Sequence, residues 1–209
     1  ILLGLVGSEM CIRDRCSGLQ ILAGLARDKS TAELVNVVPS NKPSDAYKAV
    51  AEKAKEFLPT YMHRWMNRSV CKRTVMTIPY NATKDSSRKY IREALLEEGI
   101  DPTKDELTQV VNAVYSSMDT IVPGPMQVMR WIKKHVGLYI RNGAKEVEWV
   151  TPSGFIVNQR RDDIETERME LQLLGRTQVR LPTGKTTPSP TKHKSSTAPN
   201  YIHSFDASI

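Results

Sequence analysis

Apolar side chains recur every three or four positions as far as Asn142, a spacing that places them on one face of an α-helix. The clearest stripe runs from Pro43 to Leu58, with lysine and glutamate on the opposite face. Proline and glycine mark the expected helix ends, because proline lacks the backbone donor and glycine favours the turn that closes a helix. The pattern predicts helices over these ranges: Gly18–Asp28, Pro43–Leu58, Met62–Ile78, Asp85–Glu98 and Met126–Asn142.

A further helix is expected between the last two of these. Its apolar stripe runs from Leu107 to Met118, and Asp101 and Pro102 are expected to cap it. In the helix that follows, five large apolar side chains repeat at helical spacing, and we expect them to face a core. They are Trp131, Ile132, Val136, Tyr139 and Ile140.

After Gly143 the helical spacing gives way to alternation. Val147–Val150 and Phe155–Val157 flank a Pro-Ser-Gly turn, which predicts two strands joined by that turn. Apolar and polar residues then alternate, which predicts a β-hairpin over 164–181 with one apolar and one polar face. From 182 to 200 the chain is rich in Thr, Ser, Pro and Lys without an apolar stripe, and we expect a flexible loop. The predicted fold class is therefore α+β, mostly helical, with a β-hairpin.

The charge balance narrows the choice of partner. The 209 residues include 30 Lys and Arg against 23 Asp and Glu, a formal net charge of +7. Such a balance suits a polyanion such as nucleic acid, although ribosomal and membrane-surface proteins are basic too. The three cysteines, Cys11, Cys16 and Cys71, form no CxxC pair. Neither a zinc site nor a disulfide framework is indicated, and a reducing intracellular compartment is expected.

One short run carries the strongest candidate chemistry. Arg68 and Lys72 are four residues apart in a predicted helix, and Tyr80 directly follows Pro79. Residues at this spacing share a helix face, so the two cations can clamp a polyphosphate while the phenol touches the sugar or base. Basic pairs at the same spacing more often line a solvated face. The spacing alone leaves both interpretations open.

The run itself, RSVCKRTVMTIPYN at Arg68–Asn81, closely resembles the nucleotide-binding finger helix of single-subunit RNA polymerases from bacteriophages and mitochondria. Five other segments resemble the same family and occur in the same order. They are CSGLQ at Cys16–Gln20, VNVVPSNKPSDAY at Val35–Tyr47, WVTPSGF at Trp149–Phe155, LLGRTQVRL at Leu173–Leu181 and APNYIHSFDAS at Ala198–Ser208. Because these matches span nearly the whole chain, they are far more specific than one motif.

The resemblance implies the fingers and part of the palm of a right-hand-shaped polymerase. Residues 16–34 would end a palm segment, 35–203 would form the fingers with the 164–181 hairpin and the 182–200 loop, and 204–209 would re-enter the palm. The complete enzyme would transfer nucleotides from NTPs to an RNA 3′ end on a DNA template, with Mg²⁺ as cofactor. The implied partners are a double-stranded DNA template with its promoter, nascent RNA and NTPs, and no membrane. The enzyme is expected to be an intracellular monomer, in host cytoplasm for a phage or in the mitochondrial matrix for an organelle.

The same resemblance assigns roles to side chains. Lys72 matches the helix lysine that contacts the triphosphate and supports catalysis, and Arg68 matches a second phosphate contact one turn earlier. Tyr80 matches the tyrosine that distinguishes ribose from deoxyribose, with a half-buried packing tyrosine as the alternative. The family often has Gly next, where this chain has Asn81, a residue that tolerates the same positive φ. His203 matches a histidine that faces the active-site groove, with a structural histidine as the alternative.

Two further assignments keep a structural alternative of comparable weight. Tyr47 matches a family tyrosine near the template and nucleotide pocket, yet its place on an apolar stripe favours core packing at least as strongly. The hairpin aligns with the loop that reads promoter bases in the phage branch, and its polar face would enter a major groove. A plain solvated face is the alternative. The candidate readers are Arg168, Glu170, Gln178 and Arg180.

The metal ligands of the family are expected to be missing from this chain. The first metal-binding Asp would fall at Arg13, with Asp14 one place off, and the second belongs to a motif beyond the last residue. Asp206 precedes that motif and is not assigned to metal. Residues 1–15 resemble a translated sequencing-adapter read, so we expect them to be non-native and the homology to begin at Cys16. The chain alone is therefore expected to be inactive.

Two other functions fit part of the pattern: a non-catalytic nucleic-acid-binding module and a related DNA polymerase. NTP binding that depends on Lys72 would distinguish a polymerase from the module, and Tyr80 favours RNA synthesis over DNA synthesis. The run Thr183–Thr187 resembles the end of a phosphate-binding P-loop. Val179 stands where that motif needs its first glycine, so no ATPase site is assigned.

Overall fold

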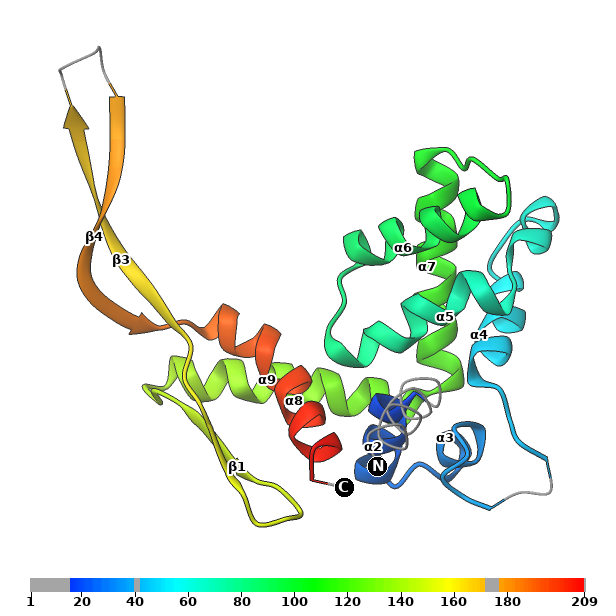
Figure 1. The fold of residues 1–209 in the computed structure, drawn as a ribbon, viewed down its shortest axis with the longest axis horizontal. Coiled ribbons are helices and arrows are strands. Elements are labelled where there is room, and N and C mark those ends of the chain that lie inside the picture. Colours follow the sequence, from blue (N-terminus) through cyan, green and yellow to red (C-terminus); the bar gives the residue numbers. More distant parts are fainter. Residues whose placement is uncertain (1–15, 40–41, 172–176, 209) are drawn as a thin grey trace, which may run out of the picture.

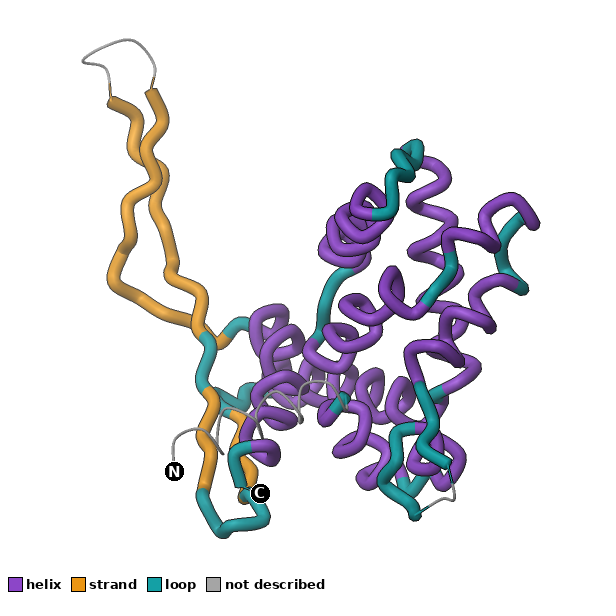
Figure 2. The backbone as a smooth tube through the Cα atoms, turned by 45° about the vertical axis from the view of Figure 1, so that its right-hand side comes forward, coloured by secondary structure: helices purple, strands orange, loops and turns teal. Residues whose placement is uncertain are grey.

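The computed structural model describes residues 16–39, 42–171 and 177–208. Within these ranges, a body of helices carries two separate antiparallel hairpins, and the longer hairpin extends away from the helices (Figures 1 and 2). The mostly helical α+β class predicted from the sequence is confirmed. No helix in the described ranges combines the length and the apolar character needed to cross a membrane.

Helices α2 to α8 precede the strands in the chain, and the last helix, α9, follows the strands and returns to the first. Two 3₁₀ turns, η1 at Thr60–Trp65 and η2 at Ile78–Tyr80, flank α5. The final helix packs along α8 and also reaches α2 and η2, so the two ends of the described chain meet (Figure 1). The helices are α2 Ser17–Ala26, α3 Lys29–Leu34, α4 Ala46–Lys55, α5 Arg68–Thr77, α6 Lys84–Glu97, α7 Lys104–Ile121, α8 Pro123–Arg141 and α9 Pro190–Asp206.

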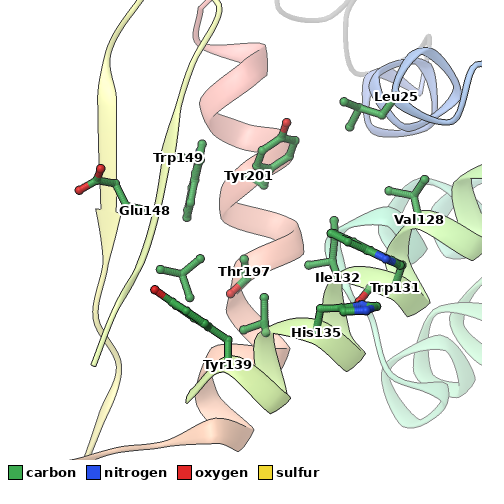
Figure 3. Close-up of a pocket in the computed structure, with 12 residues that line it drawn as sticks. Leu25, Val128, Trp131, Ile132, His135, Tyr139, Glu148, Trp149, Thr197 and Tyr201 are labelled. Atoms are coloured by element: carbon green, nitrogen blue, oxygen red, sulfur yellow. The ribbon is translucent and has the colours of Figure 1, made fainter. Parts of the chain in front are cut away.

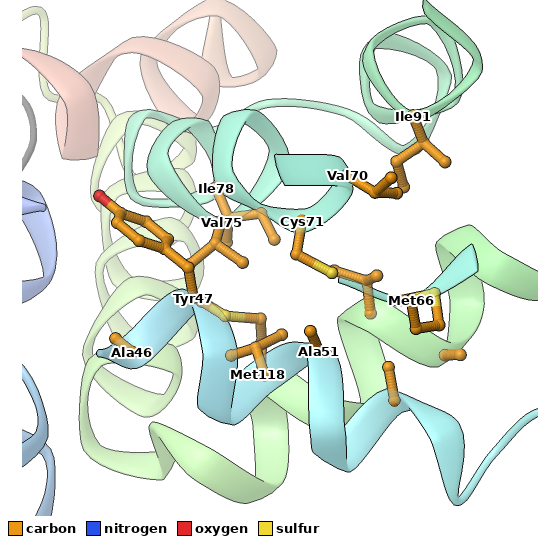
Figure 4. Packing of buried hydrophobic residues seen from close by; sticks show 14 of the residues in the cluster. Ala46, Tyr47, Ala51, Met66, Val70, Cys71, Val75, Ile78, Ile91 and Met118 are labelled. Atoms are coloured by element: carbon orange, nitrogen blue, oxygen red, sulfur yellow. The ribbon is translucent and has the colours of Figure 1, made fainter. Parts of the chain in front are cut away.

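The main core lies between α4, α5 and α7, with side chains of α6 closing one end (Figure 4). Val50 of α4, Val75 of α5 and Met118 of α7 are fully buried. Burial of each such side chain stabilises the fold by about 1.5–3 kcal/mol. This core fixes the position of α5, the helix that carries the predicted phosphate-binding residues.

Side-chain caps determine where two of these helices begin. Asp45 accepts hydrogen bonds from the backbone N–H groups of Tyr47 and Lys48, so α4 begins at Ala46 and not at Pro43. The start of α7 is a capping box of Thr103 and Glu106. The expected cap by Asp101 and Pro102 is therefore wrong. The Thr103 side chain accepts a hydrogen bond from Glu106 N, and the Glu106 side chain accepts one from Thr103 N.

The expected single helix Met62–Ile78 is wrong in its first part. Residues 60–65 form η1, and the chain is then extended at Met66 and Asn67. The Asn67 side chain accepts a hydrogen bond from Val70 N and starts α5 at Arg68. Apolar spacing cannot distinguish a 3₁₀ turn followed by a capped helix from one longer helix, because both bury Met62 and Val70.

Helix α8 buries only part of the predicted stripe: Ile140 is buried as expected, but the aromatic side chains are not. Met129 and Ile140 are buried, whereas Trp131 is 61% exposed and Tyr139 is 57% exposed. The buried stripe also includes Gly137, against which the Lys194 side chain of α9 packs so closely that it would have to move to admit a Cβ. The helix therefore presents a small residue to α9, and the prediction that both aromatic side chains face a core is wrong.

The β-structure follows the predicted alternation and extends beyond it. Strands β1 Val147–Val150 and β2 Ile156–Gln159 pair antiparallel around the Pro-Ser-Gly turn. Strands β3 Asp162–Leu171 and β4 Thr177–Pro188 form the longer hairpin, with a register shift between Ile164 and Thr166. The hairpin predicted over 164–181 is thus confirmed within the described residues, and its strands continue to 162 and 188.

The flexible loop expected over 182–200 is wrong. Strand β4 continues to Pro188, and α9 begins at Pro190 with Ser189 as its cap. The buried face of α9 combines His193 and Thr197 with Ala198 and Ile202, so it does not form the apolar stripe by which a helix is recognised. His193 accepts a hydrogen bond from Arg161 N at 3.1 Å, and Gln159 Nε2 donates to Thr197 Oγ1 at 2.8 Å. Hydrogen-bond partners in β2 and in the short link to β3 therefore allow these polar side chains to be buried.

Candidate functional site

Tyr80 lies where the end of η2, the start of α2 and the end of α9 meet. Its ring stacks on the ring of His203, with centroids 4.6 Å apart and planes 21° apart. Its hydroxyl donates to Asp206 Oδ2 at 3.3 Å, and Ser17 Oγ donates to the same oxygen at 3.2 Å. We call Ser17, Tyr80, His203 and Asp206 the Tyr80 cluster. The structure thus brings together two predicted nucleotide-site residues, Tyr80 and His203.

Two backbone features make this meeting possible. A Cβ on Gly18 would lie 2.9 Å from Pro79 Cβ and 3.2 Å from the Tyr80 ring, so a glycine is needed for α2 to approach η2 this closely. Asn81 closes η2 with a φ of 65°, and its side chain donates to the Ser195 carbonyl at 2.9 Å. The expectation that Asn81 can hold this turn in place of glycine is confirmed.

The surroundings keep both the phenol and a neighbouring thiol protonated. Burial raises the pKa of Tyr80, and the Asp206 carboxylate raises it further, while the neighbouring Ser17 hydroxyl acts in the opposite direction. Tyr80 is therefore a hydrogen-bond donor at neutral pH. Burial also raises the pKa of the Cys16 thiol to about 11, against a hydrogen bond from Tyr47. Cys16 is thus neither a nucleophile nor a thiolate ligand at neutral pH.

Arg68 occupies the first position of α5 and is held by α4. Its Nε donates to Asp45 Oδ2 at 2.7 Å. Burial disfavours ionisation of Asp45, but the hydrogen bond and charge of Arg68, together with two backbone N–H groups, outweigh it and lower the pKa of this carboxyl. The guanidinium also lies over the Tyr47 ring, 5.2 Å from its centroid. The predicted phosphate contact is therefore oriented by Asp45 and Tyr47.

Tyr47 is a core residue, as one of its two interpretations predicted. It is only 4% exposed and packs beside Val75 and Ile78 (Figure 4). Lys72 lies one helical turn after Arg68 and is partly exposed. Helix α5 therefore links two sets of contacts, Arg68 with α4 at its start and the Tyr80 cluster just beyond its end.

Segments that resemble the polymerase family contact one another in space. Gln20 Nε2 in the CSGLQ segment donates to the Val35 carbonyl at 2.7 Å. Trp149 Nε1 donates to Ser204 Oγ at 2.8 Å, which joins the WVTPSGF segment to the YIHSFDAS segment. Ser17 and Asp206 also lie in two of these segments, and they meet at Tyr80. The matches are therefore neighbours in the fold as well as in order along the chain.

The four candidate base readers share one face of the longer hairpin. Arg168 lies opposite Arg180, and Glu170 lies opposite Gln178. Directly opposed residues and residues two apart project to the same side of an antiparallel pair. All four are exposed, and Gln178 Nε2 donates to Glu170 Oε1 at 3.4 Å. Residues 172–176, between the strands, lie outside the described ranges, as do Arg13 and Asp14.

The opposite face of the hairpin carries the alternating apolar residues. Met169 lies opposite Val179 and is 48% exposed, so this face is not covered by the helical body. Thr183–Thr187 lies within β4, whereas a phosphate-binding P-loop joins a strand to a helix. The hairpin is thus a projecting arm whose polar face can approach a partner without unpacking a core.

A groove of about 800 Å³ lies elsewhere, between α8, β1 and α9 (Figure 3). Its walls are mainly aromatic and aliphatic, with Trp131, Tyr139, Trp149 and Tyr201 among the lining side chains. The Tyr80 cluster does not line it, and neither do the predicted phosphate contacts. The groove explains where the exposed aromatic side chains of α8 point, but its lining is poor in groups that bind phosphate.

The described residues do not provide a metal site. In the described ranges, no group of three or more His, Cys, Asp or Glu side chains is arranged to hold an ion. Asp206 is the carboxylate of the Tyr80 cluster, and its Oδ2 already accepts two hydroxyl protons. A catalytic metal therefore does not fit the residues described here, and no chemical step is assigned to one.

Sequence reasoning missed the roles of Asp206, Ser17 and Asp45 as partners of the predicted site residues. All three lie inside segments that resemble the family, so the sequence indicated that these segments matter. It did not indicate which residues they contact, because Asp206 is 126 residues from Tyr80 and 189 residues from Ser17. Such contacts depend on how α2 and α9 pack, which no local pattern specifies.

Comparison with known proteins gives consistent matches along the chain. The family model described as DNA-dependent RNA polymerase matches residues 12–209, a range that begins before Cys16. The mitochondrial DNA-directed RNA polymerase of Mus musculus is 29% identical over 206 residues, which cover 92% of this chain and 17% of the relative. T7 RNA polymerase of Escherichia phage T7 is 27% identical over 251 residues, covering 92% of this chain and 28% of the relative. The corresponding mitochondrial enzyme of Schizosaccharomyces pombe is 30% identical over 219 residues, which cover 92% of this chain and 19% of the relative. The chain therefore spans less than a third of the length of these relatives.

Proposed function

Because the chain belongs to the DNA-dependent RNA polymerase family of the phage and mitochondrial type, we propose that it is the part of such an enzyme that binds the incoming ribonucleotide. The stacked pair of Tyr80 and His203, just beyond the helix that bears Arg68 and Lys72, is the observation that carries this proposal. The complete enzyme joins NTPs to the 3′ end of RNA on a DNA template.

The charged residues of α5 hold the triphosphate in this proposal. A guanidinium has five N–H donors, and the bond to Asp45 uses the one on Nε. The other donors suit bidentate binding of phosphate oxygens, and Asp45 holds the plane of the group in a defined orientation. Lys72, one turn further along the helix, supplies a second cation and is the residue to which we assign support of catalysis.

The Tyr80 cluster contacts the sugar. The ring of Tyr80 is held against His203, and its hydroxyl lies at the junction of α2 and α9. A hydroxyl in a fixed position can distinguish ribose from deoxyribose, because only ribose offers a 2′-hydroxyl as a hydrogen-bond partner. We assign His203 to the same sugar-contacting surface and Tyr47 to the support of Arg68.

The rest of the enzyme supplies the metal chemistry. Nucleotidyl transfer in this family depends on a metal, which we propose to be Mg²⁺ and which would stabilise the charge on the reacting phosphate. The described residues provide no ligand set for it, so its ligands belong to parts of the polymerase outside the described ranges. The chain alone is therefore expected to bind nucleotide without transferring it.

The remaining partners follow from the same family membership. Residues 16–34 and 204–209 are assigned to the palm, and 35–203 to the fingers. The polar face of the longer hairpin contacts DNA bases, through Arg168, Arg180 and their neighbours. The enzyme binds template DNA and nascent RNA, acts as a monomer, and works in a host cell or in mitochondria.

A nucleotide-binding experiment tests the proposal on the 209-residue chain. A fluorescent ribonucleotide triphosphate is titrated into the parent, Lys72→Ala and Arg73→Ala proteins. Arg73 is the matched control, because it is a cation on the same helix that pairs with Glu93 at 2.8 Å. We expect Lys72→Ala to weaken binding about tenfold or more, as loss of a charged hydrogen bond predicts, and Arg73→Ala to change it much less.

The same two substitutions are then compared in the full-length polymerase that contains this segment, by single-turnover incorporation. Equal losses for Lys72→Ala and Arg73→Ala would refute a specific phosphate contact. DNA binding without any NTP binding by the parent chain would instead favour a non-catalytic nucleic-acid-binding module.

A further inference from the structure

We propose that Asp206 is a positioning residue that makes the Tyr80 hydroxyl an acceptor for the ribose 2′-hydroxyl, and so sets the preference for ribonucleotides. This inference rests on the proposed contact between Tyr80 and the sugar. It adds a residue, a direction for each proton and a reason for the discrimination.

Two hydroxyl groups from distant parts of the chain converge on one carboxylate oxygen of Asp206. Asp206 Oδ2 accepts from Tyr80 Oη at 3.3 Å and from Ser17 Oγ at 3.2 Å. The two hydroxyl oxygens are also 3.3 Å apart. Each hydroxyl has a single proton, and a carboxylate accepts but cannot donate. When both protons point at Asp206, no proton lies between the two hydroxyl oxygens.

This arrangement decides what Tyr80 can offer a ligand. A phenol has one donor and can also accept. Because its proton is committed to Asp206, the Tyr80 oxygen presents its remaining acceptor capacity to the nucleotide. A ribose 2′-hydroxyl can donate to it, whereas a deoxyribose has no hydroxyl to donate. Sites built to hydrogen-bond a substrate hydroxyl reject the analogue that lacks it, because the polar group of the site is then left without its partner.

The geometry also restrains the ring. His203 and Asp206 are three residues apart on α9, so they share a face of that helix. His203 holds the plane of the Tyr80 ring by stacking, and Asp206 holds its hydroxyl. The α2 backbone also lies close to the ring, because a Cβ on Gly18 would lie 3.2 Å from it. Tyr80 is half-buried, and its raised pKa keeps the proton that this arrangement needs.

The test is the ratio of kcat/KM for a ribonucleotide to that for the matching deoxyribonucleotide, in the full-length polymerase that contains this segment. Asp206→Ala removes the acceptor, and we expect the ratio to fall about tenfold, chiefly through a higher KM for the ribonucleotide. Asp206→Asn keeps an acceptor oxygen in the same place and should retain most of the preference. In a Tyr80→Phe background, Asp206→Ala should have no further effect on the ratio, because the hydroxyl it positions is gone.

The possible outcomes distinguish two claims, the contact of Tyr80 with the sugar and the positioning role of Asp206. A Tyr80→Phe enzyme with unchanged preference would refute the sugar contact itself. A relaxed preference in Tyr80→Phe, but not in Asp206→Ala, would refute only the positioning role. The positioning role would also be refuted if Asp206→Ala lowered the ribonucleotide-to-deoxyribonucleotide ratio equally in the parent and in the Tyr80→Phe background. If Asp206→Ala does not fold, as judged by circular dichroism, Asp206→Val fills more of the same space and is measured in its place.

Discussion

Arg68 Nε and Asp45 Oδ2 are 2.7 Å apart, so the first cation of the candidate phosphate clamp is paired with a carboxylate from the preceding helix. The two side chains are 49% and 36% exposed, which places the pair at the surface. Asp45 also caps α4, through hydrogen bonds from Tyr47 N and Lys48 N. One carboxylate therefore starts a helix and orients a cation that is a candidate for phosphate binding.

This double role leads to a prediction for Asp45→Asn. Asparagine caps helices as well as aspartate does, so α4 should remain intact, but the negative charge beside Arg68 is lost. We expect triphosphate binding to tighten by about two- to fivefold at low salt, the range of an exposed ion pair, and the gain to shrink at high salt. Titration of a fluorescent NTP at two salt concentrations measures it.

The control for this prediction is Asp101→Asn. Asp101 faces Arg92 at 3.8 Å on another part of the surface, so its loss changes the net charge equally without touching Arg68. The same gain in both variants would show that the effect comes from net charge. A weaker affinity in Asp45→Asn would show that Asp45 mainly orients Arg68.

The longer hairpin gives a second prediction. Arg168 and Arg180 lie opposite each other on an exposed face, where their like charges repel unless an anion lies between them. If either arginine reads a base, its substitution by alanine in the full-length polymerase should cost about 1–3 kcal/mol of promoter-binding free energy. If it contacts only phosphate, binding should weaken equally on all sequences and the salt slope should fall by about one.

Lys185→Ala is the matched control, because Lys185 is an exposed cation on β4 outside the candidate reading face. Binding is measured on promoter and scrambled duplexes across a range of salt. Unchanged affinity and salt slope for Arg168→Ala and Arg180→Ala would leave this face as a solvated surface.

Asp28 gives a prediction about stability and pH. Burial opposes its ionisation, but hydrogen bonds from Thr31, Ser30 and the Gly124 backbone outweigh that effect and lower its pKa to about 2. The unfolded value is near 3.9, so the folded state favours the ionised form. The resulting stability is present above about pH 4 and is lost as the pH falls towards 2, with an upper limit of about 2.6 kcal/mol before solvent screening reduces it.

Urea unfolding of the 209-residue chain at pH 5 and pH 2.5 measures this effect. Asp28→Asn keeps a cap for α3 but cannot ionise, so its stability should fall less than that of the parent between the two pH values. Asp105→Asn, an exposed carboxylate in the first turn of α7, serves as the control. Parallel pH dependence in the parent and Asp28→Asn would contradict the role of Asp28.

How far the sequence predicts this fold depends on which side chains carry the packing. Helices with apolar faces, such as α4 and α7, were predictable because their buried side chains recur at the helical period. Val50 of α4 and Val114 of α7 belong to these stripes. Helix α9 was not, because it buries His193 and Thr197 against hydrogen-bond partners in β2 and in the short link to β3. A periodicity of apolar residues contains no information about a buried polar face whose partners come from elsewhere.

The candidate site shows the same division. The positions of Arg68, Lys72 and Tyr80 along one helical segment were predictable from spacing and resemblance. The partners that orient them, Asp45 and Asp206, were not, because each contact joins elements whose relative placement depends on the whole core. Local sequence indicates which groups are candidates for the chemistry, and tertiary packing determines how each side chain is oriented.

The final prediction concerns two glycines of the same helix, Gly18 and Gly24. A Cβ at Gly18 would lie 2.9 Å from Pro79 Cβ and 3.2 Å from the Tyr80 ring, whereas a Cβ at Gly24 would meet nothing within 4 Å. Gly18→Ala should therefore destabilise the chain by about 1–3 kcal/mol, the usual cost of overpacking. Gly24→Ala should stabilise it by roughly 0.5–1 kcal/mol, because alanine is the better helix former.

The pair also tests the Tyr80 cluster. In Gly18→Ala the added methyl group should push the Tyr80 ring away from α2, so the full-length polymerase should lose part of its preference for ribonucleotides, whereas Gly24→Ala should keep it. Urea unfolding and the ribonucleotide-to-deoxyribonucleotide ratio of kcat/KM are measured for both variants. A Gly18→Ala protein with parental stability and selectivity would mean that α2 does not hold Tyr80 in place. A loss of selectivity in Gly18→Ala alone would show that the close approach of α2 to η2 positions the ring, because both variants add the same methyl group to the same helix.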